Sequence, residues 1–215
     1  MIKTFFKTAL RSLWKQRSFS LLNIAGLATG IACAALIFLW VEDELNYNDY
    51  FVNKENLYQV MQNQNYDGKI YTFSAQPGLL APAMQQEIPG IRQVARTTWG
   101  DRSLFHFGDK SLYGFGMNVD SSFLTMFNLE FLHGNAATAF HQPFSLVLTE
   151  SMAKKLFNAT DVVGKTLKVD NADDYEIGGV VKDLPANCRF HAVEWLAPFD
   201  IFFRRNEWLT QWGNN

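Results

Sequence analysis

The sequence contains one stretch, Val163-Gly164-Lys165-Thr166, with the ending of a phosphate-binding loop. Such a loop requires another glycine five positions before Gly164, where this sequence has Ala159, and it must open a helix. The residues that follow, Thr166 to Asp170, instead alternate between apolar and polar, as in a β-strand. We therefore predict a turn that enters a strand, and no ATP binding by this chain itself.

The other residues that could do chemistry are scattered along the chain. No two histidines have the i, i+4 spacing that places two ligands on one helix face, and Ser151 has neither a nucleophile-elbow motif nor an evident base. The histidines are His106, His133, His141 and His191. Each is interpreted as an ordinary surface or core residue.

Two further groups of residues lack the spacing of a metal site. The acidic cluster at the end of the apolar run has neither the spaced oxygen ligands nor the glycine of a calcium loop, so we interpret it as a solvated flank. The two cysteines, Cys33 and Cys188, are predicted to be unpaired thiols without a metal. The cluster comprises Glu42, Asp43, Glu44 and Asp49. We therefore predict no enzyme activity, no metal site and no cofactor.

An uncharged apolar run extends from Phe19 to Val41 and would position everything after it. As a helix of 23 residues it would span about 34 Å, enough for a hydrocarbon core of roughly 30 Å. It is longer than the apolar region of a secretory signal and ends in a poor cleavage site, and the approach to Cys33 is weak for a lipoprotein signal. We therefore predict an uncleaved transmembrane helix over residues 19–41.

Charge is distributed unevenly around this run. Five basic residues precede it without an acidic one, whereas all 21 Asp and Glu lie at or after Glu42. The positive-inside rule then places residues 1–18 in the cytoplasm and the main domain, residues 45–215, outside it. The net charge of −2 and the lack of a basic stripe after residue 45 give no sign of a nucleic-acid partner.

The segment before the run has the pattern of a basic amphipathic helix over residues 2–16. Apolar residues recur every three or four positions, and basic residues recur every four on another face. The apolar positions are Ile2, Phe5, Phe6, Ala9, Leu10, Leu13 and Trp14; the basic ones are Lys3, Lys7, Arg11 and Lys15. This helix suits the membrane interface, either as a lipid-bound flank that fixes topology or as a docking helix for a cytoplasmic partner.

Gly26 and Gly30 form a GxxxG spacing within the apolar run. Two such glycines let a second helix approach closely, whereas each weakens an isolated helix by about 1 kcal/mol relative to alanine. Because the spacing is also common by chance, an inert anchor remains the alternative. We predict that Gly26 and Gly30 are the packing site of the membrane helix.

After Leu45 the pattern changes to short strands and helices, which predicts a mixed α+β domain with mostly antiparallel strands. Thr149 is the expected N-cap of a helix over residues 149–157. The other predicted helices are 77–88 and 121–127; the predicted strands are 57–66, 70–74, 91–99, 103–107, 111–119, 129–132, 145–148, 164–169 and 175–181. The last two are expected to form a hairpin.

Several of these stretches resemble one protein family. Residues 19–51, FSLLNIAGLATGIACAALIFLWVEDELNYNDYF, are similar to the first transmembrane helix and its exit in MacB/FtsX-type ABC transporter permeases, and KTALRSLWKQRS resembles the segment before it. NVDSSFLTMFNLEFLHGN, SLVLTESMAKKLF, VVGKTLKVD and IGGVVKDLPANCRF resemble successive blocks of the MacB-like periplasmic core domain.

The resemblance implies a permease subunit of the inner membrane that works as a dimer with a cytoplasmic ABC ATPase in the lipid bilayer. Its main domain would lie in the periplasm. ATP hydrolysis by the partner would move the periplasmic domain for export or envelope remodelling. Family members continue into an FtsX-like permease domain with further membrane helices, which are absent from this sequence, so we expect an N-terminal fragment. The alternative is a single-pass membrane-anchored periplasmic sensor or ligand-binding protein; an anchored envelope enzyme is a weaker third.

Overall fold

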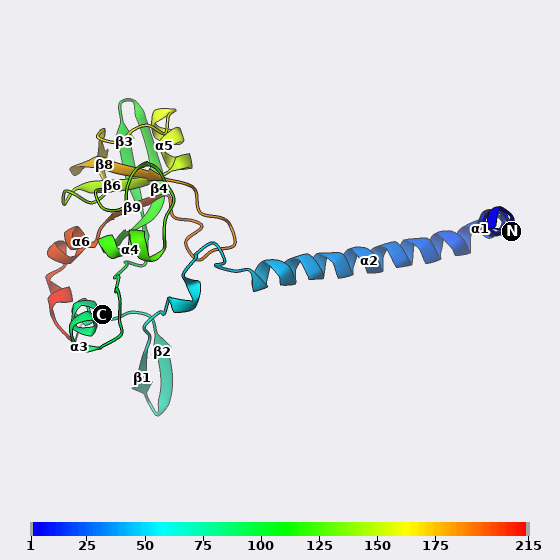
Figure 1. The fold of residues 1–215 in the computed structure, drawn as a ribbon, viewed down its shortest axis with the longest axis horizontal. Coiled ribbons are helices and arrows are strands. Elements are labelled where there is room, and N and C mark those ends of the chain that lie inside the picture. The colour runs from blue at the N-terminus through cyan, green and yellow to red at the C-terminus, as the bar shows by residue number, and fades with distance from the viewer. Residues whose placement is uncertain (1, 214–215) are drawn as a thin grey trace. The chain divides into compact units, whose positions relative to one another are not determined.

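The computed structural model describes residues 2–213, without the side chains at positions 2, 3, 5, 6, 9, 10 and 12. The chain divides into two compact parts, residues 1–47 and residues 48–215 (Figure 1). The first part is helical and the second is a mixed α+β domain, so the predicted α+β class is confirmed. Each part is considered by itself below.

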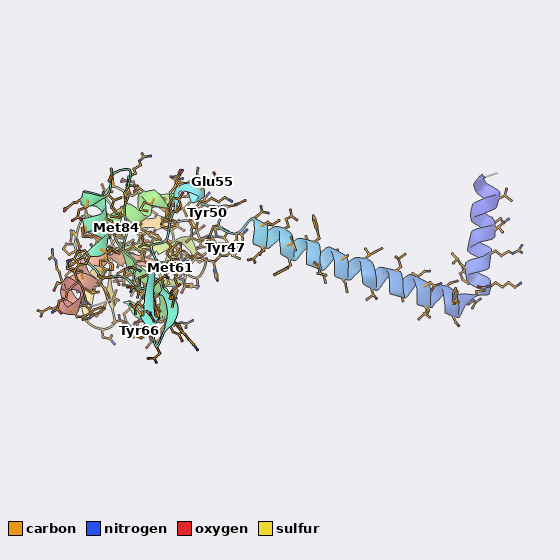
Figure 2. All side chains as sticks on the ribbon, turned by 90° about the horizontal axis from the view of Figure 1, so that it is seen from below. Tyr47, Tyr50, Glu55, Met61, Tyr66 and Met84 are labelled. Carbon is orange, nitrogen blue, oxygen red and sulfur yellow. The ribbon has the colours of Figure 1, made fainter. Side chains whose placement is uncertain are left out.

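The helical part consists of α1 (Ile2–Lys15) and α2 (Arg17–Leu45), which meet at a bend at Gln16 (Figure 2). Helix α2 is long and apolar enough to cross a membrane, and the only such helix among the described residues. The helix predicted over residues 2–16 is confirmed as α1. Of its predicted apolar face, the side chains of Ile2, Phe5, Phe6, Ala9 and Leu10 lie outside the described residues, as does Lys3 of the basic face.

The second part is built on a seven-stranded sheet with the order β5-β8-β6-β9-β4-β3-β7, in which β7 also pairs with β8. Six strands therefore close into a ring, and β5 is added outside it. Only the β4–β9 and β6–β8 pairs are parallel, which confirms a mostly antiparallel arrangement. The strands are β3 (Asp101–Phe107), β4 (Lys110–Val119), β5 (Phe131–Gly134), β6 (Ser145–Thr149), β7 (Thr166–Val169), β8 (Asp173–Val181) and β9 (Trp195–Pro198).

Strand β8 is central to the ring because it pairs along both edges. On one edge Asp173–Glu176 pairs with β7 and Gly179–Val181 with β5, and the other edge pairs with β6. A bulge falls at Gly178, where an added Cβ would lie 1.9 Å from the carbonyl oxygen of Ala139. Only glycine therefore allows the loop around Ala139 to lie against this strand.

Alternate residues of the central strands enter two separate hydrophobic clusters. In β6, Leu146 and Leu148 belong to one cluster and Val147 to the other, and all five residues of the strand are buried. The first cluster lies inside the ring and includes Met152 and Leu156 of α5 (Glu150–Phe157). The second lies outside it, under α4 (Ser121–Met126). Both faces of β6 are thus buried, which explains its continuous apolar sequence.

A smaller lobe of the second part projects from this ring (Figure 1). It contains a separate antiparallel hairpin, β1 (Gln62–Tyr66) and β2 (Lys69–Phe73), and α3 (Leu80–Glu87). The predicted hairpin turn at residues 66–69 is confirmed. The strand predicted from Leu57 begins only at Gln62.

Two stretches differ from the sequence prediction. Residues 91–99, predicted as a strand, make one bridge between Thr97 and Val119, because the segment leaves the end of β4 after two backbone hydrogen bonds. Strand β9 and α6 (Phe199–Arg205) were not predicted, since β9 has four residues and ends at Pro198. The predicted β7–β8 hairpin and the Thr149 N-cap, whose hydroxyl accepts from the Met152 N–H, are confirmed.

Arg96 joins three segments of the second part. Its Nε and Nη2 donate to the two carboxylate oxygens of Asp120 at 3.0 and 2.9 Å, and its Nη1 donates to the Gly78 carbonyl at 3.2 Å. The guanidinium also lies over the rings of Phe199 and Phe203, 4.4 and 5.2 Å from their centroids. One side chain therefore connects the start of α4, the smaller lobe and α6.

We predict that Arg96→Ala lowers the free energy of unfolding by about 2–4 kcal/mol, because it leaves a largely buried carboxylate unpaired. The free energy of unfolding of Arg96→Lys should lie between those of the parent and of Arg96→Ala, because lysine keeps the charge but cannot bind both carboxylate oxygens as arginine does. The measurement is chemical unfolding of the whole chain in detergent, followed by tryptophan fluorescence. Exposed Arg92→Ala is the control; an equal effect of Arg92→Ala and Arg96→Ala would contradict the prediction.

Candidate functional site

Gly26 and Gly30 lie on α2, which has no buried residue. A Cβ added at either glycine would have no atom within 4 Å, so this face of the helix is uncovered in the described chain. The intervening Thr29 hydroxyl donates to the Ala25 carbonyl at 2.9 Å, which satisfies its polar group within the helix. The face is free to accept a second helix, and packing at Gly26 and Gly30 stays a prediction.

Helix α2 ends at an exposed acidic turn. The amide N–H groups of Asn46 and Tyr47 donate to the carbonyls of Glu42 and Glu44. Carboxylates at a helix C-terminus oppose the helix dipole, so these side chains do not stabilise the helix end. No three metal-binding side chains gather anywhere in residues 2–213, this turn included. The interpretation as a solvated flank is consistent with this exposure.

The segment after the helix is attached to the ring domain through Asn48. Its amide N–H donates to the Asn187 carbonyl at 2.9 Å, and its side-chain Oδ1 accepts from the Arg189 N–H at 2.8 Å. Asn48 has φ of +65°, a left-handed conformation that asparagine tolerates better than most residues. Arg189 also donates to Gln59 at 2.8 Å, farther along the same segment.

Three residues later, Phe51 inserts into the outer hydrophobic cluster and is only 3% exposed. Its ring contacts those of Phe127 and Phe190 edge to face, with centroids 5.0 and 6.1 Å apart. That cluster also contains Val181 of β8 and Leu196 of β9. We name this attachment, Asn48 with Phe51, the Asn48–Phe51 anchor; Figure 2 labels Tyr50, which lies within it.

The titratable groups beside the anchor are uncharged or paired. Burial, with a smaller effect of the nearby Glu130 carboxylate, raises the pKa of Tyr50. The ion pair between Lys182 and Glu130 raises the pKa of Lys182. Burial also raises the pKa of the Cys188 thiol, which makes it a poor nucleophile at neutral pH. The anchor is therefore an apolar and hydrogen-bonded attachment with no catalytic group.

The apparent phosphate loop is a turn that enters a strand, as predicted. Gly164 has φ of +82°, and its N–H donates to the Ile177 carbonyl at 2.8 Å. The next residue, Lys165, accepts from the Ile177 N–H, and β7 begins at Thr166. These residues form backbone hydrogen bonds with β8 and do not begin a helix.

The histidines and Ser151 do not come together in one site. His106 pairs with Ser111, His133 lies near Thr160, and His191 pairs with the Cys188 carbonyl; His141 lies 3.5 Å from Glu176. The Ser151 hydroxyl and N–H donate to the Asp183 carboxylate at 2.5 and 2.9 Å, at the start of α5. Asp183 thus holds the first turn of that helix.

The hairpin of the smaller lobe has an exposed aromatic face. Tyr66, Tyr71 and Phe73 lie on the same side, with ring centroids 6.2–6.4 Å apart. Tyr66 is at the tip of the hairpin in Figure 2. No described element covers these rings, and the sequence pattern gave no sign of the grouping.

The sequence matches the family described as MacB-like periplasmic core domain over residues 20–209. Among solved structures, it is similar to a domain of a permease protein from Porphyromonas gingivalis, with 33% identity over 60% of each chain and a TM-score of 0.55. It is also similar to the periplasmic region of MacB from Actinobacillus actinomycetemcomitans, with 18% identity over 67% of this chain and 66% of that one, and a TM-score of 0.51. No curated protein matches this sequence.

We predict that Phe51→Ala releases the anchor and lowers the free energy of unfolding by about 3–5 kcal/mol, because it removes a buried ring. Hydrogen exchange should accelerate most at residues 48–57 and least in β6. Val52→Ala is the control, since Val52 is 79% exposed, and it should change stability by no more than about 0.5 kcal/mol. Unchanged exchange at residues 48–57 in Phe51→Ala would show that the ring does not hold this segment.

Proposed function

Because this chain belongs to the family of MacB-like periplasmic core domains, we propose that it works within a permease subunit of a bacterial ABC transporter. Hydrolysis of ATP by a partner ATPase in the cytoplasm moves helix α2, and the helix moves the outer domain. That movement drives export or envelope remodelling. The chain contributes the moving part and no chemistry of its own.

The observation that supports this proposal most is the short connection between α2 and the Asn48–Phe51 anchor. Helix α2 ends at Leu45, and Phe51, six residues later, is buried in the ring domain. Six residues reach at most about 20 Å when extended, and the two hydrogen bonds of Asn48 shorten the free length further. A connection with so little slack transmits a displacement of the helix, whereas a long flexible linker would absorb it.

Helix α1 is proposed to lie in the cytoplasmic membrane interface, beside the ATPase. The charges of Lys7, Arg11 and Lys15 are exposed on it. At the bend into α2, the Arg17 guanidinium lies 5.1 Å from the Trp14 ring centroid and donates to the Trp14 carbonyl at 3.2 Å. Tryptophan with a basic residue is a common anchor at the membrane–water interface. This contact supports an α1 that follows the surface while α2 crosses the bilayer.

The partner of the glycine face is proposed to be a second permease protomer. Cys33 is three positions after Gly30 and seven after Gly26, so it lies on the same side of α2. If two copies of α2 pack through this side, their Cys33 thiols approach each other. The buried Cys188 is a thiol that cannot take part without unfolding.

We predict that oxidation of membranes that contain the complete permease and its ATPase links two protomers through Cys33. The yield should differ between nucleotide-free and ATP-trapped transporter, because the ATPase moves the helix. Replacing both glycines, Gly26→Leu with Gly30→Leu, should abolish the link by keeping the helices apart. The measurement is the dimer band on a non-reducing gel.

The matched control replaces two alanines at the same spacing on the opposite side of the helix, Ala28→Leu with Ala32→Leu. This pair should keep both the link and its dependence on ATP. A link that forms equally in the glycine variant would exclude packing at Gly26 and Gly30. If the yield of the Cys33 link in the parent did not change with ATP, α2 would act only as a membrane anchor.

A further inference from the structure

A cavity of about 120 Å³ lies inside the closed sheet. Every strand of the ring contributes to its wall, and α6 covers it. The lining residues used below are Phe105, Trp195, Asn118, Asp170, Tyr175 and Arg205. Because the wall combines all six strands, the cavity is a property of the closed ring.

The apolar wall is rigid. Phe105 is fully buried and meets Trp195 edge to face, with ring centroids 5.9 Å apart. The Trp195 indole N–H donates to the Gly114 carbonyl at 2.9 Å, which fixes the orientation of the ring. The space is therefore preformed, with flat aromatic surfaces on one side.

Other residues that line the cavity are polar. Burial raises the pKa of Tyr175, which is 7% exposed. The charge of Arg205 lowers this pKa, and the carboxylates of Asp173 and Asp170 raise it. Because Tyr175 lines the cavity, its phenolic oxygen can accept a hydrogen bond from a molecule bound there.

The polar groups around the cavity present more acceptors than donors. Asn118 uses its amide N–H on the Pro198 carbonyl at 3.1 Å, which leaves its side-chain oxygen available. One carboxylate oxygen of Asp170 accepts from the Leu104 N–H at 2.7 Å, and the other oxygen remains available as an acceptor. Arg205 is neutralised by Asp173 at 2.5 Å. An anion would therefore be disfavoured, and a hydrogen-bond donor favoured.

Size restricts the occupant further. An engineered apolar cavity of about 150 Å³ is known to admit benzene, so about 120 Å³ leaves room for no more than one small ring. Small-molecule sites combine apolar walls with a few polar groups, and the mouth of a closed sheet is a common place for them. Water alone would hydrogen-bond to the polar residues but would leave the aromatic rings in contact with water.

We propose that this cavity binds a neutral molecule with a single ring and a hydrogen-bond donor, whose donor reaches Tyr175 and Asp170 while its ring lies against Phe105 and Trp195. This site is separate from the proposed function, which does not require it. The bound ring fills the space beneath α6. Ligand binding thus holds α6 in place.

The test uses the whole chain in detergent, with para-fluorophenol as the probe and fluorobenzene as the probe without a donor. Fluorine NMR measures the binding of each. We expect saturable binding of para-fluorophenol and at least about tenfold weaker binding of fluorobenzene, which lacks the hydrogen bond. Hydrogen exchange in α6 should slow on addition of para-fluorophenol.

Tyr175→Phe removes the hydroxyl while keeping the shape of the wall, and should weaken para-fluorophenol binding about tenfold. Tyr113→Phe is the matched control, because Tyr113 is 63% exposed and lies away from the cavity; it should bind like the parent. Equal binding to both variants would overturn the proposal, as would binding without saturation or without slower exchange in α6. The thermal unfolding of each variant verifies that it is folded.

Discussion

The structure depends most on the pairing of β7 with both β3 and β8, which closes the sheet into a ring. Closure removes two sheet edges and gives the strands an inside, filled by α5 and the aromatic wall of the cavity, and an outside, covered by α4 and the Asn48–Phe51 anchor. A closed sheet resists bending because each strand is held on both sides. The ring is therefore a rigid body to which a moving helix can be attached.

The attachment uses few residues, all near the chain's entry into the ring domain. Asn48 and Phe51 follow the acidic exit of α2 and bind to residues 187–190 and to the ring as well as to each other. Arg96 then holds the smaller lobe and α6 to the start of α4. The smaller lobe is thus held at two places, by the chain that runs from Phe51 into β1 and by Arg96.

Features with a local signal could be predicted from the sequence: the apolar helix, the Thr149 N-cap and the β7–β8 hairpin around its turn. Those that depend on distant partners could not. The contact between Asn48 and Arg189 joins positions 141 residues apart. No local pattern in either segment predicts it. Strand β9 is short, ends at Pro198, and exists because β4 and β6 pair with it from elsewhere in the chain. Packing at Gly26 and Gly30 needs a second helix and stays a prediction.

We propose that the short connection between α2 and the Asn48–Phe51 anchor transmits helix movement to the outer domain. The most direct test inserts a flexible glycine–serine linker between Tyr47 and Asn48 of the complete transporter and measures the spin–spin distance between labels at Asp101→Cys of the two protomers, with and without ATP. The parent should show an ATP-dependent change in distance, and the insertion should abolish it while ATP hydrolysis continues. The same change in distance with the linker in place would show that the connection does not transmit the movement.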